Sequence, residues 1–215
     1  MDPNPRPALP GTRLRRTRVG RACSRREASA CRRGSLATKV RVRLRASRLY
    51  LGLVSFSVVR RILVTGMSGT GKSSALAALA RQGFDVIDTD EPGWSTWSEV
   101  EDGFVWKEDR IAELLTARPL RPQFVSGAVS NQGRFYTCFD EVVLLSAPAD
   151  VVLQRIARRD DNDFGKTDAQ RASILRDLRE VEPLMRRTCT VEIDATQPLQ
   201  VIVEQLARLG LGSDS

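Results

Sequence analysis

Histidine is absent from the 215-residue chain. Without an imidazole, the chain cannot form a Ser-His-Asp triad, use a histidine general base or bind a metal through histidine. Cysteine is scarce as well, and Cys23, Cys31, Cys138 and Cys189 form no Cys-x-x-Cys pair. The sequence therefore supports neither a disulfide framework nor a zinc site, and we expect reduced thiols, as in a cytosolic protein.

Long apolar runs are also missing. A transmembrane helix needs roughly 18–20 consecutive apolar residues, and the nearest candidate, residues 49–59, is too short. We therefore expect no membrane partner and a cytoplasmic location.

Acidic residues are nearly lacking from the first part of the chain. Residues 1–60 contain 16 Lys and Arg but only 2 Asp and Glu, whereas residues 61–215 contain 18 and 24. The net charge of +8 therefore averages a strongly basic segment and an acidic one. The overall charge gives no argument that the remainder binds nucleic acid.

Residues 1–57 are rich in Arg and Pro and show no sustained hydrophobic period, so we expect them to be disordered and to precede a domain over 58–212. Three interpretations remain: a start codon assigned too far upstream, a basic arm that contacts RNA or membrane, and an organelle transit peptide. We expect the first, with Val58 or Val59 as the alternative initiator.

The most informative motif is Gly66-Met67-Ser68-Gly69-Thr70-Gly71-Lys72-Ser73. It fits the phosphate-binding loop, or P-loop, pattern: Gly, any four residues, Gly, Lys, then Ser or Thr. Glycines let backbone N–H groups turn towards phosphate oxygens, while Lys72 would reach the β- and γ-phosphates and the Ser73 hydroxyl would bind Mg²⁺. The nucleotide-binding set predicted here is Gly66, Ser68, Gly69, Thr70, Gly71, Lys72, Ser73 and Ser74.

The residues around the motif fit the same interpretation. A short β-branched stretch, 61–65, precedes the loop, and a run of helix formers, 72–82, follows it until Gly83. A helix that begins at the loop directs the positive end of its dipole towards bound phosphate.

Strands and helices alternate along the rest of the chain. We expect strands at 61–65, 84–87, 123–126, 141–145 and 190–193, and helices at 72–82, 107–117, 149–159, 168–187 and 198–209. We expect a loop over 91–105, a short helix or loop over 131–139, Thr167 as an N-cap, and Gly210 as the end of the last helix. This alternation predicts an α/β fold with a parallel sheet and helices on both faces, and a ligand at the carboxyl ends of the strands.

Two aspartates, Asp88 and Asp90, follow the second strand directly. Mg²⁺ takes oxygen ligands and usually keeps waters plus one or two carboxylates. One aspartate could serve the metal, and the other could orient or deprotonate an acceptor hydroxyl for attack on a γ-phosphate.

With these motifs, the chain resembles the small P-loop kinases: shikimate, gluconate, dephospho-CoA and nucleoside monophosphate kinases. The stretches 125–136 and 162–166 look like a set of uncharacterised bacterial shikimate-kinase-like ATPases. The resemblance covers about residues 60–209 and implies a three-layer fold with five parallel strands in the order 2-3-1-4-5 and a mobile lid, about residues 159–167. It implies ATP and Mg²⁺ as cofactors.

The resemblance also implies site roles. Asp88 would serve Mg²⁺ and Asp90 the acceptor hydroxyl; Arg110, in an Arg-x-x-Glu run, is similar to an acceptor-binding arginine. Residues 191–198, which include Thr196, look like the last strand and the loop on the adenine side. Shikimate kinase carries Gly-Gly-Gly after its third strand, whereas Ser126-Gly127-Ala128 stands here, so shikimate itself is in doubt.

Three arginines, Arg155, Arg158 and Arg159, lead into the lid. Arginines of this kind neutralise charge on a transferred phosphoryl group, and we expect Arg155 and Arg159 to act so, with Arg155 also binding the nucleotide. The alternative is a basic helix end that interacts with the helix dipole.

Polar residues after the third strand lie where an acceptor should bind. We expect Gly127 and Arg134 to contact the acceptor, with Arg134 pairing an anionic group. Trp94, Trp97 and Trp106 either wall this pocket or anchor a loop by burial, and we expect the second.

The sequence thus predicts an ATP-dependent small-molecule kinase, a monomer or small homo-oligomer, with catalytic residues Lys72, Asp90, Arg155 and Arg159. The alternatives are a nucleotide-dependent switch or RNA-processing NTPase that uses the basic arm, and a nucleotide-binding module without turnover. Apart from that arm, we expect no nucleic-acid partner.

Overall fold

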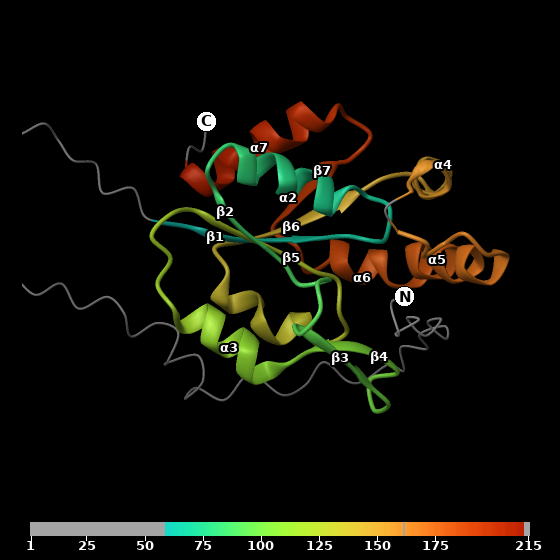
Figure 1. Ribbon diagram of the computed structural model, residues 1–215, viewed down its shortest axis with the longest axis horizontal. Helices are drawn as coiled ribbons and strands as arrows, with labels where there is room; N and C mark the ends of the chain where they lie inside the picture. The colour runs from blue at the N-terminus through green and yellow to red at the C-terminus, as the bar shows by residue number, and fades with distance from the viewer. Residues whose placement is uncertain (1–58, 161, 213–215) are drawn as a thin grey trace, which may run out of the picture.

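The computed structural model describes residues 59–160 and 162–212. The start-site, basic-arm and transit-peptide interpretations of residues 1–57 lie outside these residues. A parallel sheet of five strands forms the centre, in the order β2-β5-β1-β6-β7 (Figure 1). This is the predicted order 2-3-1-4-5, and the α/β fold class is confirmed.

The sheet strands are β1 (Arg61–Thr65), β2 (Asp85–Asp88), β5 (Gln123–Ser126), β6 (Glu141–Ser146) and β7 (Val191–Asp194). The helices are α2 (Lys72–Arg81), α3 (Glu108–Thr116), the 3₁₀ helix η1 (Gln132–Cys138), α4 (Ala149–Arg158), α5 (Asp168–Glu180), α6 (Glu182–Arg186) and α7 (Leu199–Leu211). β1 is buried along its whole length between β5 and β6, as expected for the apolar central strand of a parallel sheet.

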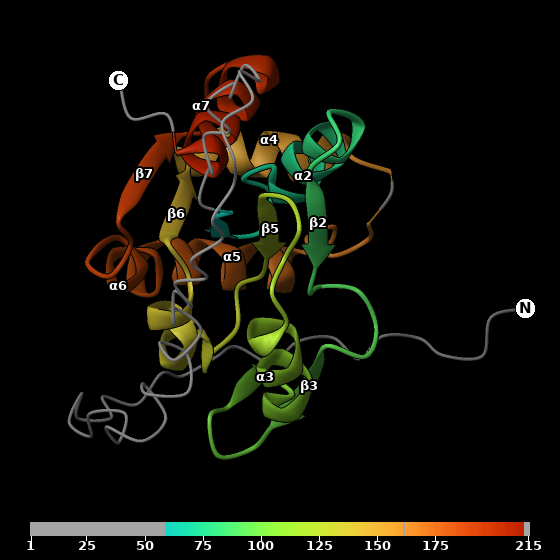
Figure 2. The same ribbon diagram turned by 90° about the vertical axis from the view of Figure 1, so that its left-hand side faces the viewer.

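Helices cover both faces of the sheet (Figures 1 and 2). α2 and α7 lie on one face, and α3 and α6 on the other. Ile62 and Val64 of β1 join the core on the α2 side, whereas Leu63 joins the core on the α3 side. The alternation follows from strand geometry, since successive side chains point to opposite faces.

A two-stranded antiparallel hairpin, β3 (Ser95–Ser98) and β4 (Gly103–Trp106), replaces the loop expected over residues 91–105. Its turn includes Asp102, whose φ of 46° is unusual for a residue other than glycine. The hairpin packs Trp97 edge-to-face on Phe104, with ring centroids 5.4 Å apart. The expectation of a loop was wrong because cross-strand pairing here outweighs the turn-forming composition.

The helix expected over residues 168–187 is two helices, α5 and α6, separated at Val181. Pro183 explains the break, because it has no N–H group to continue the helical bonds. The start of α5 is as predicted: Thr167 accepts from the Gln170 N–H in a capping box.

The last helix passes Gly210, which was expected to end it, and ends at Gly212 in the left-handed conformation. A Cβ on Gly210 would lie 2.7 Å from the Phe124 ring. Gly210 therefore allows α7 to approach the sheet closely. This role could not be predicted from the sequence.

Candidate functional site

The P-loop joins β1 to α2 at the carboxyl edge of the sheet. Gly69 and Gly71 have φ of 85° and 96°, the left-handed region that glycine adopts without strain. Gly66, with φ of 145°, lies so near β6 that a Cβ would come within 2.4 Å of the Leu145 carbonyl oxygen. The predicted strand, loop and helix are confirmed, and the glycines are required by backbone geometry.

Lys72, at the first position of α2, is buried, with 7% of its surface exposed. Its ammonium group donates to the carbonyl oxygens of Gly66, at 2.7 Å, and Met67, at 3.3 Å. Burial lowers the pKa of Lys72, while the negative charges of Asp90 and Asp88 oppose this shift. The structure thus brings the loop lysine and the two strand-end aspartates into one electrostatic environment.

Asp88, at the end of β2, lies beside the start of α2. The Ser73 hydroxyl donates a 3.0 Å hydrogen bond to one oxygen of the Asp88 carboxylate, and the Asp90 N–H donates to the other at 3.1 Å. A hydroxyl and a carboxylate at this spacing beside a P-loop fit the oxygen-ligand preference of Mg²⁺. Among the described residues, no three or more His, Cys, Asp or Glu side chains group into a metal site, so Mg²⁺ here would need phosphate and water ligands too.

Arg155 of α4 links the P-loop to the loop that follows β7. Its guanidinium donates to the Ala195 carbonyl at 2.7 Å and to the Thr70 carbonyl at 3.5 Å. Thr196, the next residue, donates from both its N–H and its hydroxyl to Asp194, and these bonds lower the pKa of Asp194. Arg155, predicted to bind the nucleotide, therefore contacts the residue beside Thr196, which was predicted to lie on the adenine side.

Arg159 begins the lid and donates to the Phe164 carbonyl at 2.6 Å. Its positive charge also contributes to lowering the pKa of Lys72, which places it electrostatically near the loop lysine. Lys166, in the same segment, donates to the carbonyls of Ala157 and Arg159 at the end of α4. Lys166 therefore stabilises the helix end, where a cation is favoured, while Arg158 is exposed.

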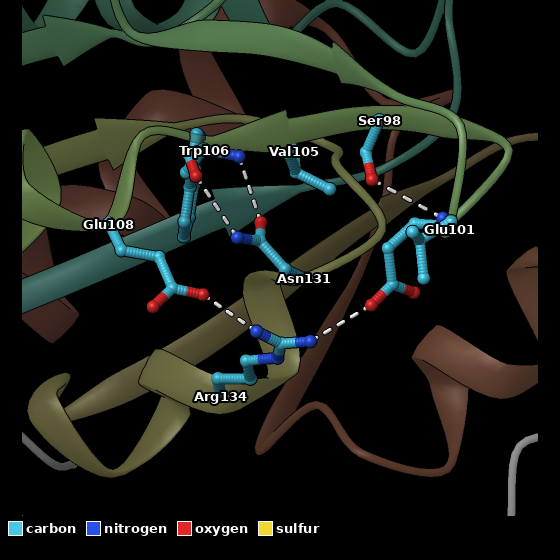
Figure 3. Close-up of a pocket in the computed structure, with 8 residues that line it drawn as sticks. Ser98, Glu101, Val105, Trp106, Glu108, Asn131 and Arg134 are labelled. Carbon is cyan, nitrogen blue, oxygen red and sulfur yellow. Dashed lines mark hydrogen bonds and ion pairs between the residues drawn. The ribbon is translucent and has the colours of Figure 1, made fainter.

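Arg134 is occupied by two acidic partners. It pairs with Glu101, from the β3–β4 turn, at 2.9 Å and with Glu108, from α3, at 2.6 Å (Figure 3). These residues line a polar cavity of about 250 Å³ under the hairpin. The two carboxylates neutralise the guanidinium, which weakens the expectation that Arg134 pairs an anionic acceptor.

The other two acceptor candidates have different surroundings. The Arg110 guanidinium lies 4.1 Å from the Trp94 ring centroid, a cation–π contact that holds it on the Pro-Gly turn before the hairpin. Gly127 is fully surrounded: a Cβ would meet Thr89 Oγ1 at 2.3 Å and Trp106 at 2.9 Å. Its small size is explained by packing, and acceptor contact by Gly127 remains a prediction.

Sequence reasoning missed Thr89 and the hydrogen bond that joins it to Trp106. Thr89 is fully buried and Trp106 is 1% exposed, and the two are joined by a side-chain hydrogen bond of 2.8 Å. Burial of Trp106 agrees with the anchoring expectation, while Trp94 and Trp97 are only partly buried. The sequence signal was Trp106 itself, a large apolar residue inside an acidic segment.

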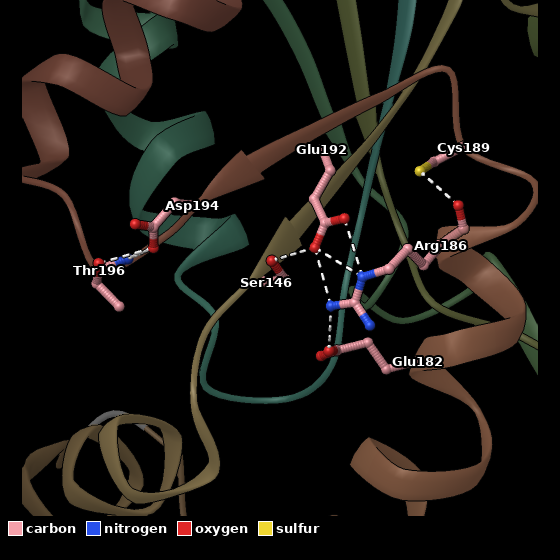
Figure 4. Close-up of polar contacts among 7 residues, drawn as sticks. All are labelled: Ser146, Glu182, Arg186, Cys189, Glu192, Asp194 and Thr196. Carbon is pink, nitrogen blue, oxygen red and sulfur yellow. Dashed lines mark hydrogen bonds and ion pairs between the residues drawn. The ribbon is translucent and has the colours of Figure 1, made fainter.

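A second polar cavity, about 550 Å³, lies at the carboxyl ends of β6 and β7. Arg186 pairs there with Glu182 and Glu192, and Ser146 also donates to Glu192, at 2.6 Å (Figure 4). The Arg186 guanidinium lowers the pKa of Glu192. This cluster ties α6 to the sheet edge.

The comparisons with known proteins agree with this fold. A family model described as "AAA domain" matches residues 62–176. Shikimate kinase from Acinetobacter baumannii, solved with shikimate, is similar at 18% identity and a TM-score of 0.51, over 74% of this chain and 97% of that one. Shikimate kinase from Bacteroides thetaiotaomicron is similar at 17% identity and the same TM-score, over 70% and 97%.

At these identities the structural likeness shows the fold, which is that of the small P-loop kinases. No curated protein matches the chain. Within the part of the chain that the structure describes, no helix is both long and apolar enough to cross a bilayer.

Proposed function

The chain belongs to the AAA domain family, and we propose that it is a small-molecule kinase, transferring the γ-phosphate of ATP to a hydroxyl or phosphate of a polar metabolite with Mg²⁺. The observation that supports this most strongly is the convergence of Lys72, Ser73, Asp88 and Asp90 at one edge of the sheet. These are the charges and oxygen ligands that phosphoryl transfer requires.

In this proposal, the loop amides and Lys72 bind the phosphates, while Ser73 and Asp88 hold Mg²⁺, whose charge would offset that on the phosphate oxygens. Asp90 is exposed, next to the metal pair, and accepts or orients the acceptor's hydroxyl proton. The positive charge of Arg159 acts on Lys72, and in this proposal Arg159 stabilises charge on the transferred group.

Arg155 acts on the nucleotide side. Its bonds to the Thr70 and Ala195 carbonyls join the P-loop to the loop after β7, so Arg155 would hold these two loops together around the nucleotide, next to Thr196. Closure of the lid would exclude water, which otherwise competes as phosphate acceptor. We propose a cytoplasmic enzyme, consistent with reduced Cys138 and Cys189.

The test is ADP release from Mg·ATP by the full-length protein, measured alone and with a panel of hydroxyl-bearing metabolites. A kinase gives release that one acceptor stimulates, together with a phosphorylated product detected by mass spectrometry. Release stimulated by RNA instead would indicate the NTPase alternative, and tight ATP binding without release would indicate a binding module. Absence of ATP binding in calorimetry would refute the proposal.

A further inference from the structure

Thr89, the residue between the two aspartates, is fastened to the end of β5. It is fully buried, its hydroxyl donates to the Ser126 carbonyl at 2.6 Å, and its backbone N–H donates to the same oxygen at 2.9 Å. Asp88 is half-buried and Asp90 is exposed. Thr89 and Asp90 form the turn after β2, in which the Glu91 N–H donates to the Asp88 carbonyl at 3.3 Å and the Asp90 N–H donates to the Asp88 carboxylate at 3.1 Å. The buried Thr89 therefore fixes the turn whose two exposed or half-buried neighbours are the aspartates, and the Asp88 carboxylate meets Ser73 of the P-loop.

Trp106, from the hairpin, completes the hydrogen bonding of the Thr89 hydroxyl. Its indole Nε1–H donates to Thr89 Oγ1 at 2.8 Å. The hydroxyl thus accepts from one element and donates to another, and every polar atom of this buried pair is used. Loss of the Thr89 hydroxyl would leave the buried indole N–H without an acceptor, and loss of the indole would leave the Thr89 oxygen without the hydrogen bond that it accepts. The surrounding residues would shift to relieve either change.

Asn131 fixes the other end of this connection. Its side-chain oxygen accepts from the Trp106 N–H at 2.8 Å, and its side-chain N–H donates to the Trp106 carbonyl at 3.0 Å (Figure 3). Asn131 is 4% exposed and immediately precedes η1. A continuous chain of hydrogen bonds therefore runs from the segment after β5, through the hairpin, back to the turn that carries the aspartates.

Gly127 leaves room for the hydrogen bond between Trp106 and Thr89, because it has no side chain. A Cβ there would lie 2.3 Å from Thr89 Oγ1 and 3.2 Å from the indole nitrogen, the two atoms that form the central bond. Because both neighbours are buried, neither can move aside easily.

We propose that Trp106 and Asn131 are positioning residues, which act through Thr89 to hold Asp88 and Asp90 at the site of phosphoryl transfer. The inference rests on the proposed kinase function, which supplies the reaction. The proposal assigns a role to the β3–β4 hairpin, because Trp106 at the end of β4 contacts the turn that contains the two aspartates.

The experiment compares full-length Thr89→Val, Thr89→Ser and Trp106→Phe with wild type. Valine keeps the shape of threonine but removes the hydroxyl, serine restores it, and phenylalanine keeps a ring but removes the indole donor. Matched controls are Thr116→Val, whose exposed hydroxyl bonds only carbonyls of its own helix, and Trp97→Phe on the hairpin. The measured quantities are kcat and KM for ATP, from ADP release with the stimulating acceptor, and hydrogen exchange of the indole N–H groups.

We expect Thr89→Val and Trp106→Phe to lower kcat on the order of 100-fold, since a displacement of about 1 Å at a reacting group has that effect. KM for ATP should change less than kcat, because the loop amides and Lys72 that would bind the phosphates keep their own contacts, while Thr89→Ser should recover most of kcat and both controls should resemble wild type. Exchange of the Trp106 indole proton should accelerate in Thr89→Val only. A merely structural role would instead change kcat and KM together.

The two proposals fail differently. If wild type binds ATP and releases ADP but folded Thr89→Val and Trp106→Phe keep their kcat, the positioning role is overturned and the kinase stands. If wild type neither binds nor hydrolyses ATP, the kinase proposal is refuted and the positioning role with it. If both variants unfold, Gly127→Ala against Gly133→Ala decides, because Gly133 has open space around its Cβ position: folded Gly127→Ala with unchanged kcat overturns the inference.

Discussion

The ammonium group of Lys72 donates a 2.7 Å hydrogen bond to the carbonyl oxygen of Gly66, the first residue of its own loop. A second bond reaches Met67, so two of the three ammonium N–H donors are used by backbone carbonyls. The lysine is thereby held at the loop with one donor left for a phosphate oxygen. Its buried position would be unfavourable for a charge without these carbonyls and the nearby aspartates.

Replacing Lys72 should therefore weaken nucleotide binding more than it disturbs the fold. In Lys72→Met, we expect Mg·ATP affinity to fall roughly 10- to 100-fold, the value of about one hydrogen bond to a charged group. Isothermal titration calorimetry measures this, with Lys107→Met, an exposed lysine before α3, as the control. Equal affinity in Lys72→Met and wild type would remove Lys72 from the site.

Asp90 should affect the transfer step and not nucleotide binding. In Asp90→Asn, we expect kcat to fall by about 10²–10⁴, the usual contribution of a general base, with ATP affinity within about twofold. Asp109→Asn, an exposed acid in the first turn of α3, is the matched control. A variant with normal kcat would show that Asp90 does not touch the acceptor, and a variant that loses ATP binding would place Asp90 with the metal.

The central sheet could be predicted because its strands are short apolar runs bounded by turn residues, and the P-loop because its spacing is strict. Ile62, Leu63 and Val64 are buried as their β-branched and apolar composition indicates. The hairpin could not be predicted from the same signals. Its first strand, Ser95–Ser98, contains a single apolar residue, so its pairing depends on β4 and on burial of Trp106.

Part of the candidate site could likewise be predicted from the sequence, because its motifs have fixed positions relative to the strands. Lys72, Ser73, Asp88 and Asp90 stand at positions that chain order alone places at the carboxyl edge of a parallel sheet. The ion-pair partners of Arg134 could not be predicted from the sequence. Glu101 lies in the hairpin turn and Glu108 in α3, and both reach Arg134 only once the hairpin has formed. The same holds for Gly127, whose neighbours Thr89 and Trp106 meet only in the folded chain.

Ile156 of α4 lies between the P-loop and the lid, and this contact can be tested. A Cβ on Gly69 would lie 2.9 Å from Ile156, and one on Gly165, which has φ of 90°, would lie 2.5 Å from it. We expect Gly165→Ala to displace the lid, raise KM for ATP and destabilise the protein by about 1–3 kcal/mol, as overpacking does. Gly133→Ala, with nothing near its Cβ position, should behave as wild type in kinetics and thermal melts. Unchanged KM and melting temperature in Gly165→Ala would contradict the contact.

Lowering the pH should reduce the free energy of unfolding in part by protonating Glu192. Its pKa is lowered first by hydrogen bonding to Arg186, with Ser146 adding to the effect. A carboxyl group whose pKa is lower in the folded than in the unfolded chain contributes stability above its unfolded value of 4.5, and that contribution disappears as the pH falls through the folded value.

In Glu192→Gln, the free energy of unfolding should therefore fall at pH 7 but not below the folded pKa of Glu192. Because both partners are substantially exposed, at 44% and 34%, screening by water limits the difference at pH 7 to about 0.2–1 kcal/mol. Urea unfolding at pH 7 and at the lowest pH at which the protein stays folded measures it, with Glu204→Gln, an exposed residue of α7, as the control. A difference of the same size at both pH values would mean that the carboxylate charge of Glu192 has no part in holding α6 against the sheet edge.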